Sequence, residues 1–340
     1  MIKRLQIAGK NGYRRREFQK NAFLYLMALP AVLYLFINNY MPLVGLVVAF
    51  KNYTFRGGIF GSQWVGLANF KYLFSTSSAW VITRNTIGYN LLFIVVNTVG
   101  SVILAILLNE IRSRRMLKAI QTAILMPYLL STVVISYLVY AFLSAQTGYI
   151  NGSILKAMGL PPVSWYSETK YWPFILSFVN FWKNFGFLTI IYYASIISID
   201  ESYYEAAEID GATRFQQIIK ITIPLMKQVI IMMVLMNIGR IFFSDFGLFY
   251  QVPQDSGMLY SVTNTIDTYV YRALMQMNDV SMASAAGLYQ SVVGFVLVIG
   301  IIVLQVLLDN KINTEEDVTK YLDMTVLGVI PQYDQGGKKE

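Results

Sequence analysis

Six long apolar stretches divide the chain, and short polar segments separate them. A helix that crosses a lipid bilayer needs about 20 mostly apolar residues. The stretches lie at residues 22–50, 86–108, 119–143, 172–197, 225–243 and 283–308. This pattern predicts an all-α polytopic membrane protein with six transmembrane helices.

Two of these stretches contain residues that disturb a regular helix. Asn38–Tyr40 and Pro42 interrupt the first stretch, and Pro127 lies inside the third. Both stretches are still interpreted as single spans. The first could be mistaken for a signal peptide because the basic segment 3–20 precedes it, but its apolar run exceeds the 7–15 residues of such a peptide and no small-residue cleavage site follows. We therefore expect a retained helix.

The composition agrees with a surface that faces lipid. Hydrophobic residues make up 56% of the chain and charged residues 14%, with a mean hydropathy of +0.50, whereas soluble domains have roughly 25% charged residues. The chain has no Cys and no His. This excludes disulfides, thiolate nucleophiles, Ser-His-Asp triads and histidine zinc sites, so we expect no catalytic residue and no metal site.

The basic residues predict the orientation in the membrane. Cytoplasmic loops carry an excess of Lys and Arg beside the spans. With both termini in the cytoplasm, the inner segments hold 18 of the 27 basic residues: Lys3, Arg4, Lys10, Arg14, Arg15, Arg16, Lys20, Arg112, Arg114, Arg115, Lys118, Arg214, Lys220, Lys227, Lys311, Lys320, Lys338 and Lys339. A net charge of +8 also suits a nucleic-acid-binding arm, but the repeated placement beside spans favours topology, and we expect no nucleic-acid partner.

The inner loop 198–224 has the pattern of two short helices joined by a turn. Asp200 or Ser202 is suited to cap the first helix, and Gly211 is suited to end it. Three glutamates, at positions 201, 205 and 208, are spaced to share one face of that helix. A second short helix follows, with Phe215, Ile218 and Ile219 on one side, and Pro224 begins the fifth span. Such a shape suits insertion into a groove of a partner protein.

The same loop resembles a known family motif. Glu205-Ala206-Ala207, three residues, Gly211, nine residues, Ile221, one residue and Ile223-Pro224 resemble the EAA loop of binding-protein-dependent ABC importer permeases. The usual motif has Leu before the proline, where this chain has Ile223.

Three further segments resemble the carbohydrate branch of that family. Trp64–Leu67 with Asn69-Phe70 is similar to a signature of sugar permeases, and 245–251 and 267–272 are similar to the subgroup that imports oligosaccharides such as pectin fragments. The resemblance covers residues 20–305. It implies a type I ABC importer permease fold, in the cytoplasmic membrane of a bacterium, with a permease domain at 22–308 between a basic N-terminus at 1–21 and a cytoplasmic tail at 309–340.

The resemblance also implies the partners. These are a second related permease, two cytoplasmic ATPase subunits that use ATP and Mg, an extracytoplasmic solute-binding protein and a carbohydrate substrate. Glu205 would make a polar contact with the ATPase, Ala206 and Ala207 would allow close approach, Gly211 would make the turn, and Ile221 and Pro224 complete the motif. A solvated charge at a helix end is the alternative for Glu205. The chain has no G-x-x-x-x-G-K-[ST] phosphate loop, so it is expected to be no enzyme and to bind no cofactor.

Polar and aromatic residues inside the spans predict a path for the sugar. Such residues usually face a bundle interior or a water-filled cavity. The candidates are Tyr89 and Asn90 in the second span, Asn180, Trp182 and Lys183 in the fourth, and Asn237 and Arg240 in the fifth, where Asp245 is a possible ion partner of Arg240. Lys183 and Arg240 favour an acidic sugar such as a uronide. The alternatives are hydrogen bonds between helices and snorkelling of the two cations to the interface.

Three other functions remain open. The tail 309–340 resembles the cytoplasmic end of polysaccharide chain-length regulators, and a polysaccharide-assembly regulator would have two spans flanking a large outer domain. A membrane transferase acting on lipid-linked sugars would need acidic or histidine clusters near a membrane face. An ABC importer permease for a non-sugar solute would share the EAA loop.

Overall fold

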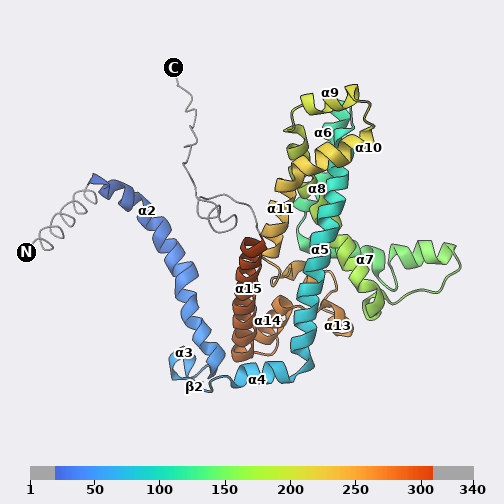
Figure 1. Ribbon diagram of the computed structural model, residues 1–340. Coiled ribbons are helices and arrows are strands. Elements are labelled where there is room, and N and C mark those ends of the chain that lie inside the picture. Colours follow the sequence, from blue (N-terminus) through green and yellow to red (C-terminus); the bar gives the residue numbers. More distant parts are fainter. Residues whose placement is uncertain (1–19, 309–340) are drawn as a thin grey trace, which may run out of the picture. The chain divides into compact units, whose positions relative to one another are not determined.

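A computed structural model describes residues 20–308 of the chain (Figure 1). The predictions for the basic N-terminus and for the tail 309–340 lie outside the described residues. The chain divides into two units, Met1–Gly294 and Phe295–Glu340, and all contacts described below lie within the first.

Helices make up nearly all of the described structure. The long and medium helices are α2 (Ala22–Leu35), α5 (Ser77–Asn109), α6 (Arg114–Leu129), α7 (Thr132–Leu143), α8 (Trp172–Ile197), α11 (Ile223–Ile238), α14 (Ile266–Met275) and α15 (Val280–Leu308). The short ones are α3 (Gly58–Gly61), α4 (Ala68–Ser75), α9 (Ser202–Ile209), α10 (Arg214–Gln217), α12 (Phe246–Gln251) and α13 (Tyr260–Thr263). Turns of π- or 3₁₀-helix are η1 (Phe36–Tyr40), η2 (Met41–Phe50), η3 (Ile150–Leu155), η4 (Trp165–Ser167), η5 (Thr169–Tyr171), η6 (Ile218–Thr222) and η7 (Gly257–Leu259). The strands β1 (Lys51–Asn52) and β2 (Gln63–Trp64) form one antiparallel pair, with Lys51 opposite Trp64.

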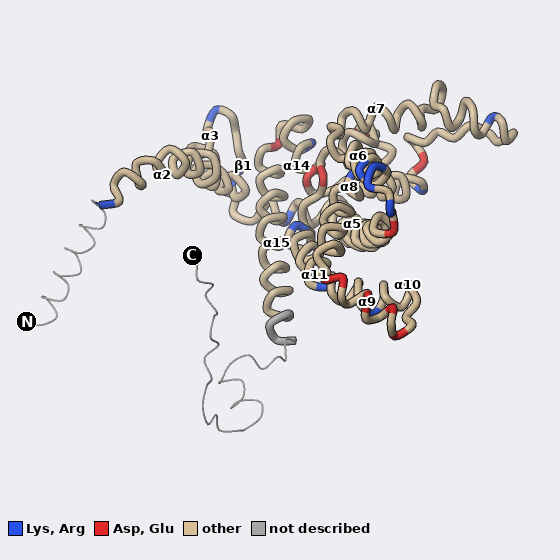
Figure 2. Tube along the Cα trace, turned by 90° about the horizontal axis from the view of Figure 1, so that it is seen from above, with Lys and Arg blue, Asp and Glu red and all other residues tan. Residues whose placement is uncertain are grey.

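The prediction of six spans is confirmed. Five helical segments are long and apolar enough to cross a membrane: Ala22–Phe50, Ser77–Asn109, Thr169–Ile197, Arg214–Ile238 and Val280–Val303. The pair α6 and α7 provides the sixth when it is counted as one span. Figure 2 shows α2 and α15 without charged residues along their described lengths, while charges gather at other helix ends and in loops.

The first span is helical throughout, so the interruption expected at Asn38–Tyr40 and Pro42 is only a change of winding. The chain passes from α2 through the π-turn η1 into the 3₁₀-type η2. Pro42 lies in the first turn of η2, directly after the π-turn η1, and Asn38 Nδ2 donates to the Tyr34 carbonyl at 2.9 Å.

The third span is broken, contrary to the interpretation of 119–143 as one continuous helix. Helices α6 and α7 are bent by 96° relative to each other. Leu130 and Ser131 have extended backbone at the break, and the Ser131 hydroxyl accepts the amide of Val134 to begin α7. Pro127 lies within α6, where its ring removes one helical hydrogen bond shortly before the helix ends.

Close packing of α5, α8 and α6 forms the centre of this unit. Helix α5 packs along α8, and α6 crosses α8 at Gly186. A Cβ atom at Gly186 would overlap the backbone carbonyl of Ile124, so only glycine lets the two helices approach this closely. Such small residues are common at helix contacts in membranes.

Gly186→Ala should therefore destabilise the protein, because the added methyl group meets backbone that cannot turn aside. Overpacking of this kind costs about 1–3 kcal/mol. We expect a lower melting temperature for the detergent-purified protein. Gly88→Ala is the matched control, since a Cβ atom there has open space. Equal melting temperatures for the two variants would contradict the tight crossing.

Candidate functional site

The loop 198–224, called the EAA loop below, begins with helix α9. Asp200 accepts the backbone N–H of Ser202 through Oδ1 at 2.9 Å, as expected of a capping residue, while Glu201 at the N-cap position makes no side-chain cap. The pKa of the Asp200 carboxyl lies below its ordinary value because the backbone N–H and the side chain of Ser202 hydrogen-bond to it.

Gly211 ends α9 in the way that the sequence predicts. Its φ is +75°, a conformation that L residues rarely adopt. The Gly211 amide donates to the Glu208 carbonyl at 3.0 Å, and the Ala212 amide donates to the Ala207 carbonyl at 2.8 Å. This pair of bonds is a Schellman motif, which closes the helix end and turns the chain sharply.

The second helix of the loop is longer than predicted. Thr213 starts it with a capping box: Gln216 donates its amide to the Thr213 hydroxyl, and Thr213 donates its own amide to Gln216 Oε1 at 2.8 Å. From there α10, the π-turn η6 and α11 form one helix, Arg214–Ile238. Pro224 lies in the first turn of α11, as expected, but α11 continues the helix of the loop without a gap.

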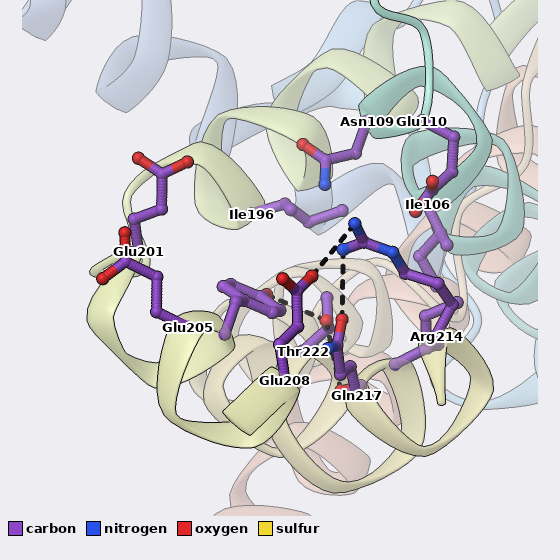
Figure 3. Close-up of a pocket in the computed structure, with 12 residues that line it drawn as sticks. Ile106, Asn109, Glu110, Ile196, Glu201, Glu205, Glu208, Arg214, Gln217 and Thr222 are labelled. Atoms are coloured by element: carbon purple, nitrogen blue, oxygen red, sulfur yellow. Dashed lines mark hydrogen bonds and ion pairs between the residues drawn. The ribbon is translucent and has the colours of Figure 1, made fainter. Parts of the chain in front are cut away.

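A pocket of about 370 Å³ lies between the EAA loop and the ends of α5 and α8 (Figure 3). It is lined by Ile106, Asn109, Glu110, Ile196, Glu201, Tyr204, Glu205, Glu208, Arg214, Gln217, Ile218 and Thr222. Glu201 at the N-cap of α9 and Glu205 and Glu208 within α9 line it together, as their spacing predicts. Arg214 pairs with Glu208 at 3.0 Å and donates to Gln217 at 3.2 Å, whereas Glu201 and Glu205 form no ion pair within residues 20–308.

One hydrogen bond ties the two helices of the loop together. The hydroxyls of Tyr204 and Thr222 lie 2.9 Å apart, and Thr222 is buried. Tyr204 is on α9 and Thr222 is at the end of η6. The loop is therefore one folded unit joined to the fifth span.

The loop exposes large apolar side chains among its charged residues. Ile209 is 87% exposed, Phe215 70% and Tyr203 57%, and Ala206 is exposed beside them. Exposed apolar patches of this kind mark contact sites for proteins or membranes. Sequence reasoning placed Phe215 on one side of its helix with Ile218 and Ile219, but only Ile218 lines the pocket, and Phe215 points outward.

The sugar-permease signature at 64–70 has a structural role. Trp64 is paired into the short sheet and stacks on Phe50, with ring centroids 5.8 Å apart. Gly66 adopts φ +60° to turn the chain, and Asn69 Nδ2 donates to the carbonyls of Ala49 and Lys51 at 2.8 and 3.0 Å. The signature ties the end of the first span to α4.

The residues predicted to line a sugar path are mostly bonded within the chain. Tyr89 is buried against Phe93 and Phe249, and Trp182 packs on the same apolar cluster. Asn180 Oδ1 accepts from Asn97 Nδ2 at 2.8 Å. These contacts are hydrogen bonds and packing between helices, and the assignment of the residues to a path stays a prediction.

The expected ion pair between Arg240 and Asp245 is wrong. Asp245 lies 3.6 Å from Lys183 Nζ, and it also caps α12 by accepting the Leu248 amide at 3.1 Å. Lys183 Nζ further donates to the Thr132 hydroxyl at 2.5 Å. Lys183 thus connects α8 to the start of α7, just after the break in the third span, and to the start of α12.

The fifth span ends at Ile238, earlier than the predicted residue 243. Ile241 and Phe242 follow in a turn and are buried in an apolar cluster. Asn237 is exposed and donates to the Met233 carbonyl at 2.7 Å. Arg240 is exposed, and its side chain has no hydrogen-bond or ion partner among residues 20–308.

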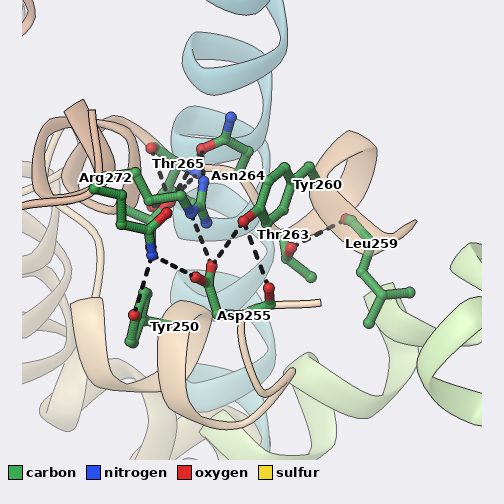
Figure 4. A network of polar contacts seen from close by, with 10 residues as sticks. Tyr250, Asp255, Leu259, Tyr260, Thr263, Asn264, Thr265 and Arg272 are labelled. Atoms are coloured by element: carbon green, nitrogen blue, oxygen red, sulfur yellow. Dashed lines mark hydrogen bonds and ion pairs between the residues drawn. The ribbon is translucent and has the colours of Figure 1, made fainter. Parts of the chain in front are cut away.

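A buried arginine organises the segment between α12 and α14 (Figure 4). The side chain of Arg272 is 4% exposed, donates from Nε to Asp255 at 2.8 Å and from Nη1 to Asn264 at 2.7 Å. Its guanidinium lies 4.0 Å from the centre of the Tyr260 ring, and the Tyr260 hydroxyl donates to Asp255 at 3.2 Å. Burial raises the pKa of Tyr260. In the sequence, Arg272 stands out only as part of a motif that resembles the family. The acidic residue Asp255, 17 positions earlier, was the one sign that Arg272 has a buried ion partner.

Comparison with known proteins identifies the chain. Residues 97–313, more than half of it, match the family model described as "Binding-protein-dependent transport system inner membrane component". The chain belongs to this family. Its members are transport permeases of the inner membrane, not enzymes, and they work with a solute-binding protein. Six apolar spans also argue against a two-span polysaccharide-assembly regulator.

Relatives of this permease match over nearly their whole length. Protein LplB of Bacillus subtilis is 32% identical, over 86% of this chain and 91% of its own. The polygalacturonan/rhamnogalacturonan transport system permease protein YteP of the same organism is 34% identical, over 81% and 85%.

Solved structures agree with the sequence relatives. A chain of a bacterial ABC transporter involved in the import of the acidic polysaccharide alginate superposes with a TM-score of 0.78 at 30% identity, covering 86% of this chain and 98% of that one. A chain of the bacterial alginate ABC transporter, in complex with a periplasmic protein that holds an alginate pentasaccharide, has a TM-score of 0.75 at 31% identity, covering 84% and 94%. The expected ABC importer permease fold is therefore confirmed.

Gly211→Val should loosen the EAA loop, because a β-branched residue is strained at this positive φ. A left-handed conformation costs an L residue roughly 1–2 kcal/mol, so trypsin should cleave after Arg214 about 5–30 times faster. Gly211→Asn is the matched control, since Asn tolerates this conformation. Cleavage of both variants at the wild-type rate would refute the role of Gly211.

Asp255→Ala should destabilise the protein strongly, because it leaves the buried Arg272 charge without its partner. Breaking a buried pair in this way costs about 3–5 kcal/mol. Tyr260→Phe removes only one hydroxyl and should cost about 1 kcal/mol. Melting temperatures in detergent compare the two, and a loss for Asp255→Ala no larger than for Tyr260→Phe would show that the pair is not the centre of this network.

Proposed function

We propose that this permease imports oligosaccharides, acidic ones among them, across the bacterial cytoplasmic membrane. The observation that carries the proposal is its similarity, over more than four fifths of both chains, to proteins named for polygalacturonan and alginate transport. Both polymers are built from uronic acids, so the shared chemistry is a chain of sugar rings that carries carboxylates.

The EAA loop is proposed to couple this permease to a separate ATPase in the cytoplasm. Its placement there follows from the bias of basic residues. The exposed apolar residues Tyr203, Ile209 and Phe215 offer a contact surface, and Ala206 lets a partner approach closely. Glu205 lies beside them, exposed and without an ion partner in the described structure, and would form the polar contact. ATP and Mg are used by that partner.

Movement of the ATPase would be transmitted to the membrane through the continuous helix that joins the EAA loop to the fifth span. Helix α9 is tied to η6 by the hydroxyls of Tyr204 and Thr222, and η6 continues into α11 without a break. Ile221 and Pro224 lie at this junction. Displacement of the loop would thus tilt or shift the fifth span, a hinge or shear motion of the kind that opens and closes such paths.

A second permease subunit is proposed to cover the exposed first span. No residue of α2 is buried, and only 6% of the most apolar window of the span is buried in the chain. A related permease, together with lipid, would supply the missing contacts. The sugar path would run between the two subunits, past the polar faces of the fourth and fifth spans.

Of the proposed path residues, Asn237 and Arg240 are exposed, Asn90, Trp182 and Lys183 are partly exposed, and Tyr89 and Asn180 are buried. Asn90, Asn180, Trp182 and Tyr89 would support the path from behind, because their side chains bond or pack between helices. A solute-binding protein would deliver the sugar from outside.

The test is ATP hydrolysis stimulated by a sugar-loaded binding protein in the reconstituted complex. The wild type should respond to oligogalacturonides, and Glu205→Lys should lower the response at least tenfold, because a cation would replace the carboxylate proposed to form the polar contact. Glu168→Lys is the matched control, as Glu168 is exposed and lies outside the EAA loop; it should keep the response.

Two results would contradict the proposal. Full stimulation of Glu205→Lys would remove the coupling role of that residue. A wild-type complex that responds to amino acids or phosphate but to no oligosaccharide would overturn the substrate class.

A further inference from the structure

We infer that Arg240 recognises the carboxylate of an acidic sugar in the translocation path, and that Lys183 does not. This inference rests on the proposed function, since it names the group that reads the charge of the substrate. It is carried by the way the turn 239–244 is anchored and by the different surroundings of the two cations.

The turn that presents Arg240 is fixed from one side by helix α5. Asn90 Nδ2 donates to the carbonyls of Ile241 and Phe243, at 2.8 and 2.9 Å. One side-chain amide thus holds two carbonyls of the backbone directly after Arg240. Since α5 is also the helix packed along α8, the turn is attached to the centre of the protein.

Two more side chains fix the same turn from α15 and α14. Gln290 is buried, and its Nε2 donates to the Phe242 carbonyl at 2.8 Å. Asp267 Oδ2 accepts both the amide and the hydroxyl of Ser244, each at 2.7 Å. Every residue from 241 to 244 therefore has a backbone group bonded to a side chain of another element. Such support makes a binding group rigid before its ligand arrives.

Two large side chains of this turn, Arg240 and Phe243, are directed away from the core. Ile241 is 9% exposed and Phe242 2%, while Arg240 is exposed. The backbone of the turn is thus fixed by hydrogen bonds, while the guanidinium of Arg240 stays exposed. Asn237 lies one turn earlier on the same exposed face, and the Arg240 amide donates to its carbonyl at 3.0 Å.

The other cations of this region have hydrogen-bond partners within the described chain. Lys183 has Asp245 and Thr132, Arg272 has Asp255 and Asn264, and Arg84 donates to Asn85 and to the Ser261 carbonyl. Lys183 with Asp245 is a neutral pair and offers no net attraction to an anion. Among these four basic residues, Arg240 alone has no partner in the described part of the chain.

A guanidinium without a partner suits this recognition. Arg240 lies in the turn directly after the fifth span, and arginine binds carboxylates through two parallel hydrogen bonds. The Oδ1 atom of Asn237, beside it, is available to accept a sugar hydroxyl. The two side chains together match a uronic acid unit, which carries a carboxylate and hydroxyls on one ring.

The test measures uptake by the complete complex in vesicles, with trigalacturonate and its neutral methyl ester as substrates. Arg240→Lys should keep the wild-type ratio of free-acid to ester uptake within about threefold. Arg240→Gln should lower the ratio about tenfold, the size expected for a lost charge-assisted hydrogen bond, and Arg240→Glu should lower it further. Because one binding protein delivers both sugars, a change of the ratio belongs to the permease. Arg56→Gln, an exposed charge in the segment between the first two spans, is the control and should leave the ratio unchanged.

Several results would overturn the inference. An unchanged ratio in Arg240→Gln would do so. A parallel loss of both uptake rates, with less second permease copurifying, would show that Arg240 pairs with that subunit instead. If the wild type transports the free acid and not the ester, the uptake ratio cannot be measured. In that case, equal uptake of the acid by Arg240→Lys, Arg240→Gln and Arg240→Glu would overturn the inference.

Failure of the proposed function is distinguishable from failure of the inference. A wild type that transports no oligosaccharide contradicts the function. A wild type that transports the ester and not the acid leaves oligosaccharide import standing and refutes both the acidic substrates and the role of Arg240.

Discussion

Lipid offers no hydrogen-bond partners to a peptide backbone, so every polar group of a membrane-spanning segment must find its partner inside the protein. Regular helices meet this demand by themselves, and the rest of the structure follows from the places where they stop. At the break in the third span, Ser131 caps the new helix and Lys183 reaches the next residue, Thr132. At the end of the fifth span, Asn90, Gln290 and Asp267 bind the backbone that the helix leaves unpaired. The polar side chains of the spans are thus placed largely where backbone needs them.

The same constraint explains why most residues that resemble a sugar path are engaged elsewhere. A buried amide that bonds to a backbone carbonyl satisfies both groups and fixes the distance between two helices. Asn90 has this role through the Ile241 carbonyl, and Asn180 joins two helices in a similar way by accepting from the side chain of Asn97. Arg240 differs from them because its backbone is held while its side chain is left outside, an arrangement that stabilises nothing within the chain.

Much of the fold follows from local sequence, and the remainder depends on contacts between distant residues. The lengths of the apolar stretches were sufficient for six spans, and Gly211, Asp200 and the glutamate spacing were sufficient for α9 and its turn, because each depends on neighbours a few residues away. The sharp bend at 130–131 was not predicted, since Pro127 is the only local signal, and the contact of Lys183 on α8 with Thr132 after the bend joins residues far apart in sequence. The pairing of Asp245 with Lys183 instead of Arg240 was missed for a similar reason: the two residues are far apart in sequence, and only the packing of α12 on α8 brings them together.

The π-turn η6 has a consequence for how the EAA loop is aimed. A π-turn holds one residue more than an α-helical turn, and each residue of an α-helix advances the chain by about 100° around its axis, because one turn takes 3.6 residues. The extra residue between Ile218 and Thr222 therefore sets the rotational position of α9 about the axis of the fifth span. Rewinding these five residues into a regular helix would swing the exposed edge of Ile209 and Phe215 by about a quarter of a circle. The direction in which the loop faces a partner thus depends on the one extra residue in this π-turn, which lies just before Pro224.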